Sequence, residues 1–175
     1  GETWSGNLLT GVSRSKLPSM GIAIHPRDPA ILLLATASAG VYRSADGGQT
    51  WSLANSGLGS LWTHELAFAP SDPTVVWLTT HDGVYRSEDT GQTWARRDTG
   101  WAYTFTHALA VDPQNPDVVY VGNAVELHSA HSDHANEGIH QGGGLYKTTD
   151  AGNSWHRIDQ DMEESNVVAM ATHPY

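Results

Sequence analysis

The stretch GVYRSADGGQTW, at residues 40–51, is the part of this sequence from which the fold can be predicted. It recurs almost unchanged as GVYRSEDTGQTW at residues 83–94, and more loosely as GLYKTTDAGNSW at residues 144–155. Each copy follows a nearly continuous apolar run (ILLLAT, VVWLTT or VVYVGN), and each of these runs follows an alternating run that ends in proline. Every unit therefore contains four short strands, and the chain is a tandem repeat.

The apolar runs indicate how the units pack. Strands that are apolar on both faces are covered on both faces. A four-stranded unit of about 40–45 residues that packs between its neighbours is a β-propeller blade. The alternative, a β-sandwich, would not require the same turn chemistry at the same place in every unit. We therefore predict an all-β protein, a β-propeller built of four-stranded blades.

The ends of the chain match parts of the unit. Residues 1–15 begin with GETW, which matches the last half of the recurring stretch, so we expect an orphan fourth strand there. Residues 163–175 contain VVAMATHPY, which matches a first strand, so we expect an orphan first strand at this end. The three whole blades are predicted at residues 16–58, 59–101 and 102–162. We expect either a piece of a larger propeller or a chain that closes a ring with other chains.

The recurring stretch has the composition of a tight hairpin between the third and fourth strands. We expect its Asp to bond the backbone two residues further on, and its Gly to allow a positive φ. Its Ser or Thr offers a hydroxyl across the hairpin, and its Trp supplies a large apolar area with one N–H. These structural positions are Ser44, Asp46, Gly48, Trp51, Ser87, Asp89, Gly91, Trp94, Thr148, Asp150, Gly152 and Trp155.

The pattern Ser/Thr-x-Asp-x-Gly-x-Thr/Ser-Trp resembles the Asp-box, or bacterial neuraminidase repeat. The Asp-box superfamily includes sialidases, xyloglucanase-type glycoside hydrolases, sortilin-type receptors and photosystem assembly factors, and all of these are propellers. In them, the loops between second and third strands share one face with the loops that join blades, and the Asp-boxes lie on the opposite face. The resemblance implies that binding or chemistry takes place on the first of these faces.

Composition excludes several classes of function. The chain has 175 residues, a formal net charge of −10 and no cysteine. An acidic surface repels phosphate backbones and anionic membrane surfaces, so we expect no nucleic-acid partner. The sequence has no run of about 18 apolar residues, so we also expect no membrane insertion. Without cysteine there is neither a disulfide framework nor thiolate chemistry. A secreted or periplasmic location is implied by the resemblance alone.

The third unit carries an insertion. Trp51 and Trp94 are 43 residues apart, whereas Trp94 and Trp155 are 61 residues apart. The 18 extra residues fall between the second and third strands of the third blade. Imidazoles can ligate Zn, Cu or Ni, so a transition metal is one interpretation of the histidines in this insertion, and a polar surface loop that is rich in histidine is the other. The candidate ligands are His128, His131, His134 and His140.

Further candidates for a site come from the register of the repeat. His64 and His107 occupy the same position in two first strands, which line the central channel of a propeller, so both should lie near its mouth. The alternative is that duplication and ordinary channel polarity explain them. Loops of the same face add residues that could hold a sugar ring or a peptide. For Trp62 and Trp101 the alternative is a purely structural role, in which each indole packs between adjacent blades. The residues that these loops add are Trp62, His81, Asp82, Trp101 and Tyr103.

These features favour a binding or assembly module for a protein or glycan partner, with no complete catalytic site in the chain. The alternative is part of a glycoside hydrolase, which needs two carboxyl groups about 5–9.5 Å apart. For a sialidase, the resemblance implies an Arg-Ile-Pro stretch and arginines that bind the substrate carboxylate. This chain has SKLPS at residues 15–19 in place of that stretch, and its Arg43 and Arg86 belong to the repeated third strand, where we interpret them as structural. For a xyloglucanase-like enzyme, Asp82 is a weak catalytic candidate.

Overall fold

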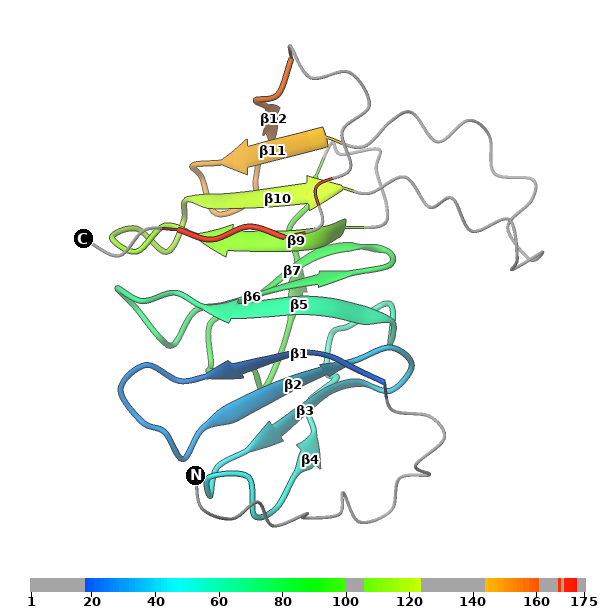
Figure 1. Cartoon of the computed structure of the whole chain (residues 1–175), viewed down its shortest axis with the longest axis vertical. Coiled ribbons are helices and arrows are strands. Elements are labelled where there is room, and N and C mark those ends of the chain that lie inside the picture. Colours follow the sequence, from blue (N-terminus) through cyan, green and yellow to red (C-terminus); the bar gives the residue numbers. More distant parts are fainter. Residues whose placement is uncertain (1–17, 100–105, 124–143, 161–166, 168, 173–175) are drawn as a thin grey trace, which may run out of the picture.

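The computed structural model describes residues 18–99, 106–123, 144–160, 167 and 169–172 of the chain. These residues form three separate four-stranded antiparallel sheets and no helix (Figure 1). The prediction of an all-β propeller with four-stranded blades is therefore confirmed. The predicted orphan fourth strand lies outside the described residues, as does most of the orphan first strand. The exact limits of each blade remain a prediction.

Each blade is a meander in which strands that follow each other in sequence pair antiparallel. Blade 1 contains β1 (Ser19–Ile24), β2 (Leu32–Thr36), β3 (Gly40–Ser44) and β4 (Ser52–Leu53). Blade 2 contains β5 (Thr63–Phe68), β6 (Val76–Thr80), β7 (Gly83–Ser87) and β8 (Ala95–Arg96). Blade 3 contains β9 (Thr106–Val111), β10 (Val119–Asn123), β11 (Gly144–Thr148) and β12 (His156–Arg157).

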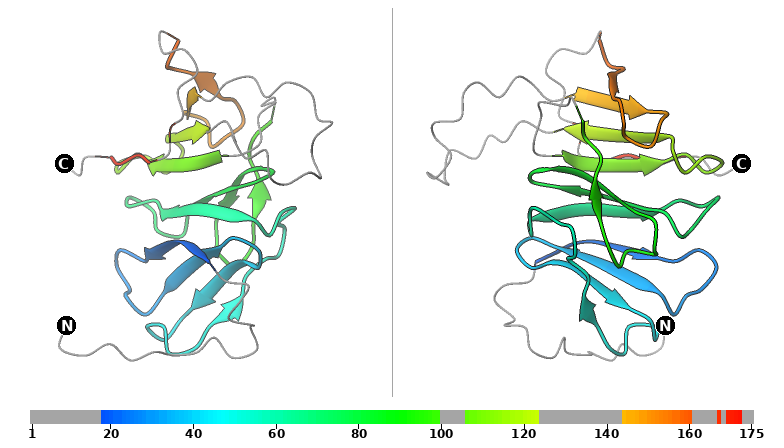
Figure 2. Two further views of the ribbon diagram at one scale, coloured as in Figure 1. Left: turned by 45° about the vertical axis from the view of Figure 1, so that its right-hand side comes forward. Right: turned by 180° about the vertical axis from the view of Figure 1, so that it is seen from behind.

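The first strands of the three blades form a common edge of the molecule. β1, β5 and β9 lie side by side, and β5 contacts the first strand of each neighbouring blade (Figures 1 and 2). The other strands of each blade extend away from this edge, so the sheets are arranged like the blades of a propeller around its axis. This arrangement places the starts of β5 and β9 next to each other.

The hairpin between the third and fourth strands has the same hydrogen bonds in every blade. In blade 1 the Ser44 hydroxyl accepts from the backbone N–H of Gly48 (2.9 Å) and donates to Asp46 Oδ1 (2.8 Å). Asp46 in turn accepts from the backbone N–H and the hydroxyl of Thr50, at 2.9 and 2.6 Å. The Thr50 hydroxyl is the main cause that lowers the pKa of Asp46 to about 2.

One detail of the hairpin differs from the prediction. The Asp bonds the backbone N–H four residues further on, and not two, in all three hairpins. The reason is that the Ser or Thr hydroxyl already accepts the N–H two residues after the Asp, as Gly48 and Gly91 show. The glycines do adopt positive φ, at 87° for Gly48, 79° for Gly91 and 81° for Gly152.

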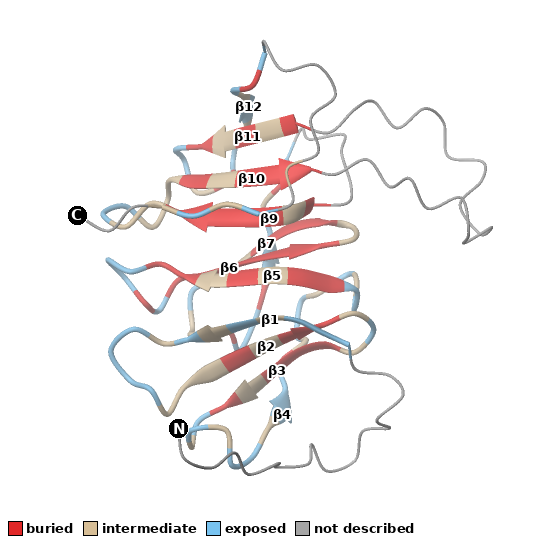
Figure 3. Cartoon of the chain, in the orientation of Figure 1, coloured by how far each residue is buried: buried red, intermediate tan, exposed pale blue. Residues whose placement is uncertain are grey.

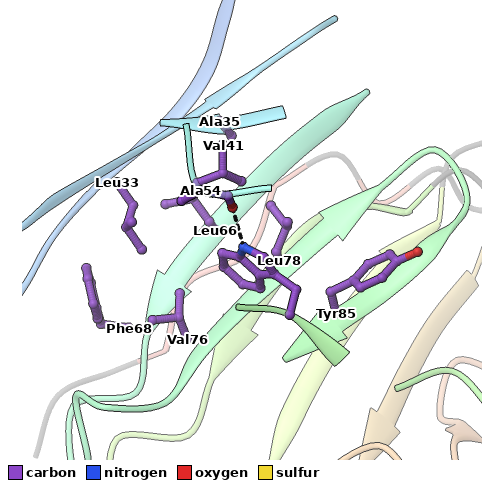
Figure 4. Packing of buried hydrophobic residues seen from close by; sticks show 10 residues of the cluster. Leu33, Ala35, Val41, Ala54, Leu66, Phe68, Val76, Leu78 and Tyr85 are labelled. Atoms are coloured by element: carbon purple, nitrogen blue, oxygen red, sulfur yellow. Dashed lines mark hydrogen bonds between the residues drawn. The ribbon is translucent and has the colours of Figure 1, made fainter. Parts of the chain in front are cut away.

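Two apolar clusters join the blades. We call the side of a blade that faces the following blade its front face, and the other side its back face. Leu33 and Val41 on the front of blade 1 pack with Leu66 and Phe68 on the back of blade 2 (Figure 4). Trp77 and its neighbours on the front of blade 2 form the second cluster with blade 3. Blade 2 is covered on both faces, and every residue of β6 is buried (Figure 3).

Hydrogen bonds between blades repeat from one junction to the next. Trp94 donates its Nε1 proton to the backbone oxygen of Ala54 in the preceding blade (2.8 Å; Figure 4). Trp155 does the same to the backbone oxygen of Arg97 (2.8 Å). In the opposite direction, the Arg43 guanidinium reaches forward to the backbone oxygen of Thr90 (3.2 Å). The hairpin tryptophans of blades 2 and 3 therefore link each of these blades to the one before it.

The described residues contain no helix of the length and apolarity that a helical membrane span needs.

Candidate functional site

The loops at one end of the blades form the surface on which the predicted site residues lie. The connection from β4 to β5, residues 54–62, ends beside two turns: the backbone oxygen of Leu61 accepts from Gly40 N, and that of Trp62 accepts from His81 N, both at 2.9 Å. We call this connection and the β2–β3 and β6–β7 turns the loop face. The hairpins between third and fourth strands lie at the other end, where Gly47 N donates to Ala30 O (2.9 Å).

Buried threonine hydroxyls join the blades just below the loop face. The Thr63 hydroxyl accepts from the backbone N–H of Thr36 and donates to its carbonyl oxygen, both at 2.8 Å. At the next junction, the Thr106 hydroxyl makes the same pair of contacts with Thr80, at 3.3 and 3.1 Å. Each hydroxyl thus satisfies the backbone N–H and C=O at the end of the preceding blade's second strand, β2 or β6. The same bonds hold the start of the next blade's first strand, β5 or β9, beside the turn that follows that second strand.

Four aromatic side chains, each from a different element or connection, lie next to one another in a row on this scaffold. The ring centroids of Trp62 and His81 are 4.7 Å apart, those of His81 and His64 are 5.3 Å apart, and those of His64 and His107 are 4.3 Å apart. We call this row the His–Trp column. It combines the end of the 54–62 connection, the β6–β7 turn and the first strands β5 and β9.

His64 is the most buried histidine of the column. The residue is only 8% exposed, and neither ring nitrogen has a hydrogen-bond partner among the residues that the structure describes. Burial, followed by the proximity of His107 and His81, lowers the pKa of His64 to about 3. The imidazole is therefore neutral at pH 7, and carries one N–H donor and one nitrogen acceptor that are both unused. A buried polar group without partners is rare, and a bound ligand is one way to satisfy it.

Asp82 lies beside His81 in the sequence but is engaged in contacts that hold the loop face together. Its carboxylate accepts hydrogen bonds from the hydroxyls of Thr80 (2.7 Å) and Tyr85 (2.9 Å). The Tyr85 oxygen also accepts from the backbone N–H of Gly59, at 3.0 Å. Burial is the main cause that raises the pKa of Tyr85. Asp82 and Tyr85 thus anchor the 54–62 connection to blade 2.

One position of the repeat, just after the fourth strand, carries a buried polar side chain that was not among the predicted residues. Asp98 is buried and forms an ion pair with Arg96 (2.7 Å), and Asp159 forms the same pair with Arg157 (2.7 Å). Asn55 takes the corresponding place in blade 1, where it accepts from Val41 N (2.8 Å). The signal for this position is in the sequence, because all three residues stand four places after a hairpin tryptophan.

The structure brings four predicted site residues together, namely Trp62, His64, His81 and His107. Trp101 and Tyr103 lie outside the described residues, and so does the metal candidate formed by His128, His131, His134 and His140. In the part of the chain that the structure describes, no group of three or more His, Asp or Glu side chains is placed to hold a metal ion. The buried threonines and Glu65, which accepts from Leu109 N in the next blade (2.9 Å), were not predicted.

Several solved structures share this fold. An ancestral GH74 enzyme is 20% identical, with a TM-score of 0.61, over 81% of this chain and 20% of its own. YCF48 from Cyanidioschyzon merolae is 17% identical, with a TM-score of 0.57, over 81% of this chain and 37% of its own. The computationally designed Ika4 protein is 17% identical, with a TM-score of 0.60, over 98% of this chain and 88% of its own. The chain thus spans well under half of the GH74 enzyme and of YCF48.

At these identities the structures establish the fold alone. No curated protein matches the chain. The model of the Sortilin-Vps10 family, described as sortilin, neurotensin receptor 3, matches residues 39–174 of this chain. This match begins just before the first complete hairpin motif and covers all three of them. The chain therefore belongs to the Sortilin-Vps10 family, within the Asp-box propeller superfamily.

Proposed function

We propose that this propeller segment is a binding module, and that a protein or glycan partner contacts the His–Trp column on the loop face. The observation that carries the proposal is His64, a buried imidazole within a row of aromatic rings, whose two nitrogens have no hydrogen-bond partner in the described part of the chain. Trp62 at the end of the row is 43% exposed, so a ligand can reach it. An exposed indole next to imidazoles offers a flat apolar surface together with hydrogen-bonding groups.

Known neighbours support a protein partner in particular, because YCF48 has been solved bound to a D1 peptide. A glycan partner is supported by the xyloglucanase of Xanthomonas campestris, whose structure resembles this chain with a TM-score of 0.57. Binding is favoured over glycoside hydrolysis, because both carboxylate oxygens of Asp82 accept hydrogen bonds from neighbouring hydroxyls. We further propose that other blades or chains complete the ring, and that the protein acts in a secreted or periplasmic setting.

Calorimetric titration with two probes tests the proposal. One probe is neurotensin, after the name of the matching family, and the other is a xyloglucan oligosaccharide, after the GH74 neighbours. We expect one probe to bind, and Trp62→Ala and His81→Ala each to weaken its binding by about tenfold or more, which corresponds to about 1.4 kcal/mol. The matched control is His156→Ala, because His156 is an exposed histidine on β12, outside the loop face.

Thermal unfolding of each variant checks that the fold is intact. Affinities that remain equal in all four proteins would place the binding site elsewhere. Failure of both probes to bind the unmodified chain at millimolar concentration would contradict the proposal for these two ligand classes. Comparison of the two probes also decides between the protein and the glycan version.

A further inference from the structure

Each first strand contains a β-bulge at the same position, close to the loop face. The pairing of β9 with β10 skips His107, and the pairing of β5 with β6 shifts between Thr63 and Leu66, where His64 stands. In β1 the skipped residue is Met20. A bulge bends its strand and re-aims the side chain of the extra residue. The two histidines therefore leave the alternating pattern of their strands in the same way.

The bulges of β5 and β9 bring two imidazoles together, because these strands lie side by side (Figure 1). The ring centroids of His64 and His107 are 4.3 Å apart, and their planes are tilted by 38°. Two nitrogens that each bind one metal ion at about 2.0–2.1 Å are at most about 4.2 Å apart. The separation of the rings therefore allows both imidazoles to bind the same ion after a rotation of the side chains.

The surroundings of His64 favour a bound ligand at this pair. The residue is buried, and neither ring nitrogen has a hydrogen-bond partner in the part of the chain that the structure describes. Buried polar atoms in native proteins normally have a partner. A metal ion bonds to one nitrogen of a neutral imidazole, so it would supply a partner that hydrogen bonds do not provide here.

The number of ligands restricts the choice of metal. Zinc sites in proteins use at least three protein ligands. Within the described ranges, no group of three or more His, Asp or Glu side chains is placed to hold an ion. The carboxylates next to the column in sequence already accept hydrogen bonds: Glu65 from Leu109 N, and Asp82 from the Thr80 hydroxyl. Two imidazoles without a carboxylate are therefore a poor site for zinc.

Charge points to a monovalent ion. The Born cost of burying an ion rises with the square of its charge, so a divalent ion costs about four times as much as a monovalent one. Two neutral imidazoles bring no negative charge to offset this cost. Imidazole is a ligand that suits copper. The ion Cu(I) is monovalent and is stable with as few as two ligands, so it matches both the charge and the number of ligands.

We propose that His64 and His107 form a binding site for Cu(I) at the junction of blades 2 and 3. The site occupies the part of the His–Trp column formed by β5 and β9, whereas Trp62 lies at the other end of the row. The inference goes beyond the proposed function, and it does not require a protein or glycan partner to bind at Trp62 and His81.

Competition with a chromophoric Cu(I) chelator, under anaerobic and reducing conditions, tests the inference on the metal-free full chain. We expect one equivalent of Cu(I) to bind. His64→Phe and His107→Phe should each lower the affinity at least about tenfold, since even the outer partners of metal ligands contribute that much. The matched control is His156→Phe, because His156 is an exposed histidine on β12, outside the column. It should leave the affinity unchanged.

Two further measurements make the result specific. The histidines at 128, 131, 134 and 140 could also bind copper, so the titration is repeated with all four replaced by Ala, and the single equivalent should remain. Nuclear magnetic resonance of the unmodified chain needs no variant to fold. Added Ag(I), a redox-stable monovalent probe, should shift the ring nitrogen resonances of His64 and His107, and saturate at one ion per chain.

Three results would overturn the inference. The first is an equal affinity for Cu(I) in the unmodified chain and in folded His64→Phe. The second is loss of the bound equivalent when the four other histidines are replaced. The third is tighter binding of Zn(II) than of Cu(I), or ring resonances of His64 and His107 that do not respond to Ag(I). Partner titration is carried out on the metal-free chain with a chelator present, so the proposed function and the copper site can fail separately.

Discussion

His64 shows how one buried residue couples the site to pH. Its imidazole is neutral because burial and two neighbouring histidines oppose protonation and lower its pKa to about 3. In the unfolded chain the same group has an ordinary pKa of about 6.5. Between these two values the unfolded chain takes up a proton that the folded chain does not, so acidification favours unfolding.

We expect the free energy of unfolding to fall as the pH is lowered from 6.5 towards 3, with a contribution from His64 of up to about 1.4 kcal/mol per pH unit. Urea denaturation of the unmodified chain and of His64→Phe, which retains a ring but cannot titrate, measures this term. The pKa of Asp46 and of Asp150 is lowered to about 2, so these two carboxyls change the free energy of unfolding only below the ordinary pKa of an aspartate. The two proteins are therefore compared between pH 4.5 and 6.5, above that range. Parallel curves for the two proteins would contradict the expectation.

Gly57 is a residue for which a single methyl group decides stability. It has a φ of 90°, and a Cβ at this position would lie 2.0 Å from the backbone oxygen of Trp94. Gly47 also has a positive φ, of 72°, but a Cβ there would meet no atom within 4 Å. Gly47→Ala therefore measures only the free-energy cost of holding a non-glycine residue in the left-handed conformation, which is about 1–2 kcal/mol.

We expect Gly57→Ala to destabilise the chain by at least about 2 kcal/mol more than Gly47→Ala, since the methyl group must displace the backbone of blade 2. Equilibrium denaturation of both variants gives the difference. Equal losses of stability would show that the connection between blades 1 and 2 adapts to the added atom.

At the scale of the element, the hairpin is both a local structure and a link between blades. Its Ser, Asp and Thr side chains satisfy the turn internally. Its tryptophan then donates outward to the neighbouring blade, as Trp94 does to Ala54 and Trp155 does to Arg97. The recurrence of the whole motif is explained because each part of it has a separate role.

Replacing the tryptophan separates these roles. Trp94→Phe keeps an aromatic ring but removes the N–H, and leaves the backbone oxygen of Ala54 without this donor. We expect a loss of about 1–2 kcal/mol in the free energy of unfolding. Trp51→Phe is the control, because Trp51 is half-buried and its N–H donates to Gly48 within its own hairpin, so a smaller loss is expected. A larger loss for Trp51→Phe would contradict the role in linking blades.

At the scale of the whole molecule, blade 2 is the one of the three described blades that packs between two others. β2 and β6 are both second strands with the same pairing in their sheets. All residues of β6 are buried, whereas two of the five residues of β2 are only half-buried. Because β6 is buried on both faces, we expect its local unfolding to cost more free energy than that of β2.

Hydrogen exchange measures this difference. We expect the amides of β6 to exchange at least about tenfold more slowly than those of β2, which corresponds to about 1.4 kcal/mol in the free energy of opening. Equal protection would mean that the three blades open as one cooperative unit.

Most of the fold could be predicted because the motif recurs at regular positions. Three copies of the hairpin locate three third strands and three fourth strands, and the apolar runs before them locate the others. Finer contacts could not be predicted in the same way. The Asp46 carboxylate bonds four residues on, because the Ser44 hydroxyl takes the nearer N–H, and this competition depends on the folded turn.

The site was less accessible to sequence analysis. The register of the repeat gives His64 and His107 equivalent positions, but says nothing about the distance between their rings. That distance depends on the angle between blades, which is set by the apolar clusters and by hydroxyls such as that of Thr106. His81 joins the row from a turn, so its contact with His64 requires two segments to be placed correctly at once.

Many side chains that link the blades donate to main-chain carbonyls. The acceptors of Trp94, Trp155, Trp77 and Arg27 are the backbone oxygens of Ala54, Arg97, Pro116 and Ser71. Every amino acid carries such an oxygen, so the accepting position is free to mutate while the link persists. A duplicated blade can therefore diverge widely on its accepting side without losing its neighbour. This freedom gives a physical reason why proteins that are only 17–20% identical to this chain, such as the GH74 enzyme and YCF48, share its fold.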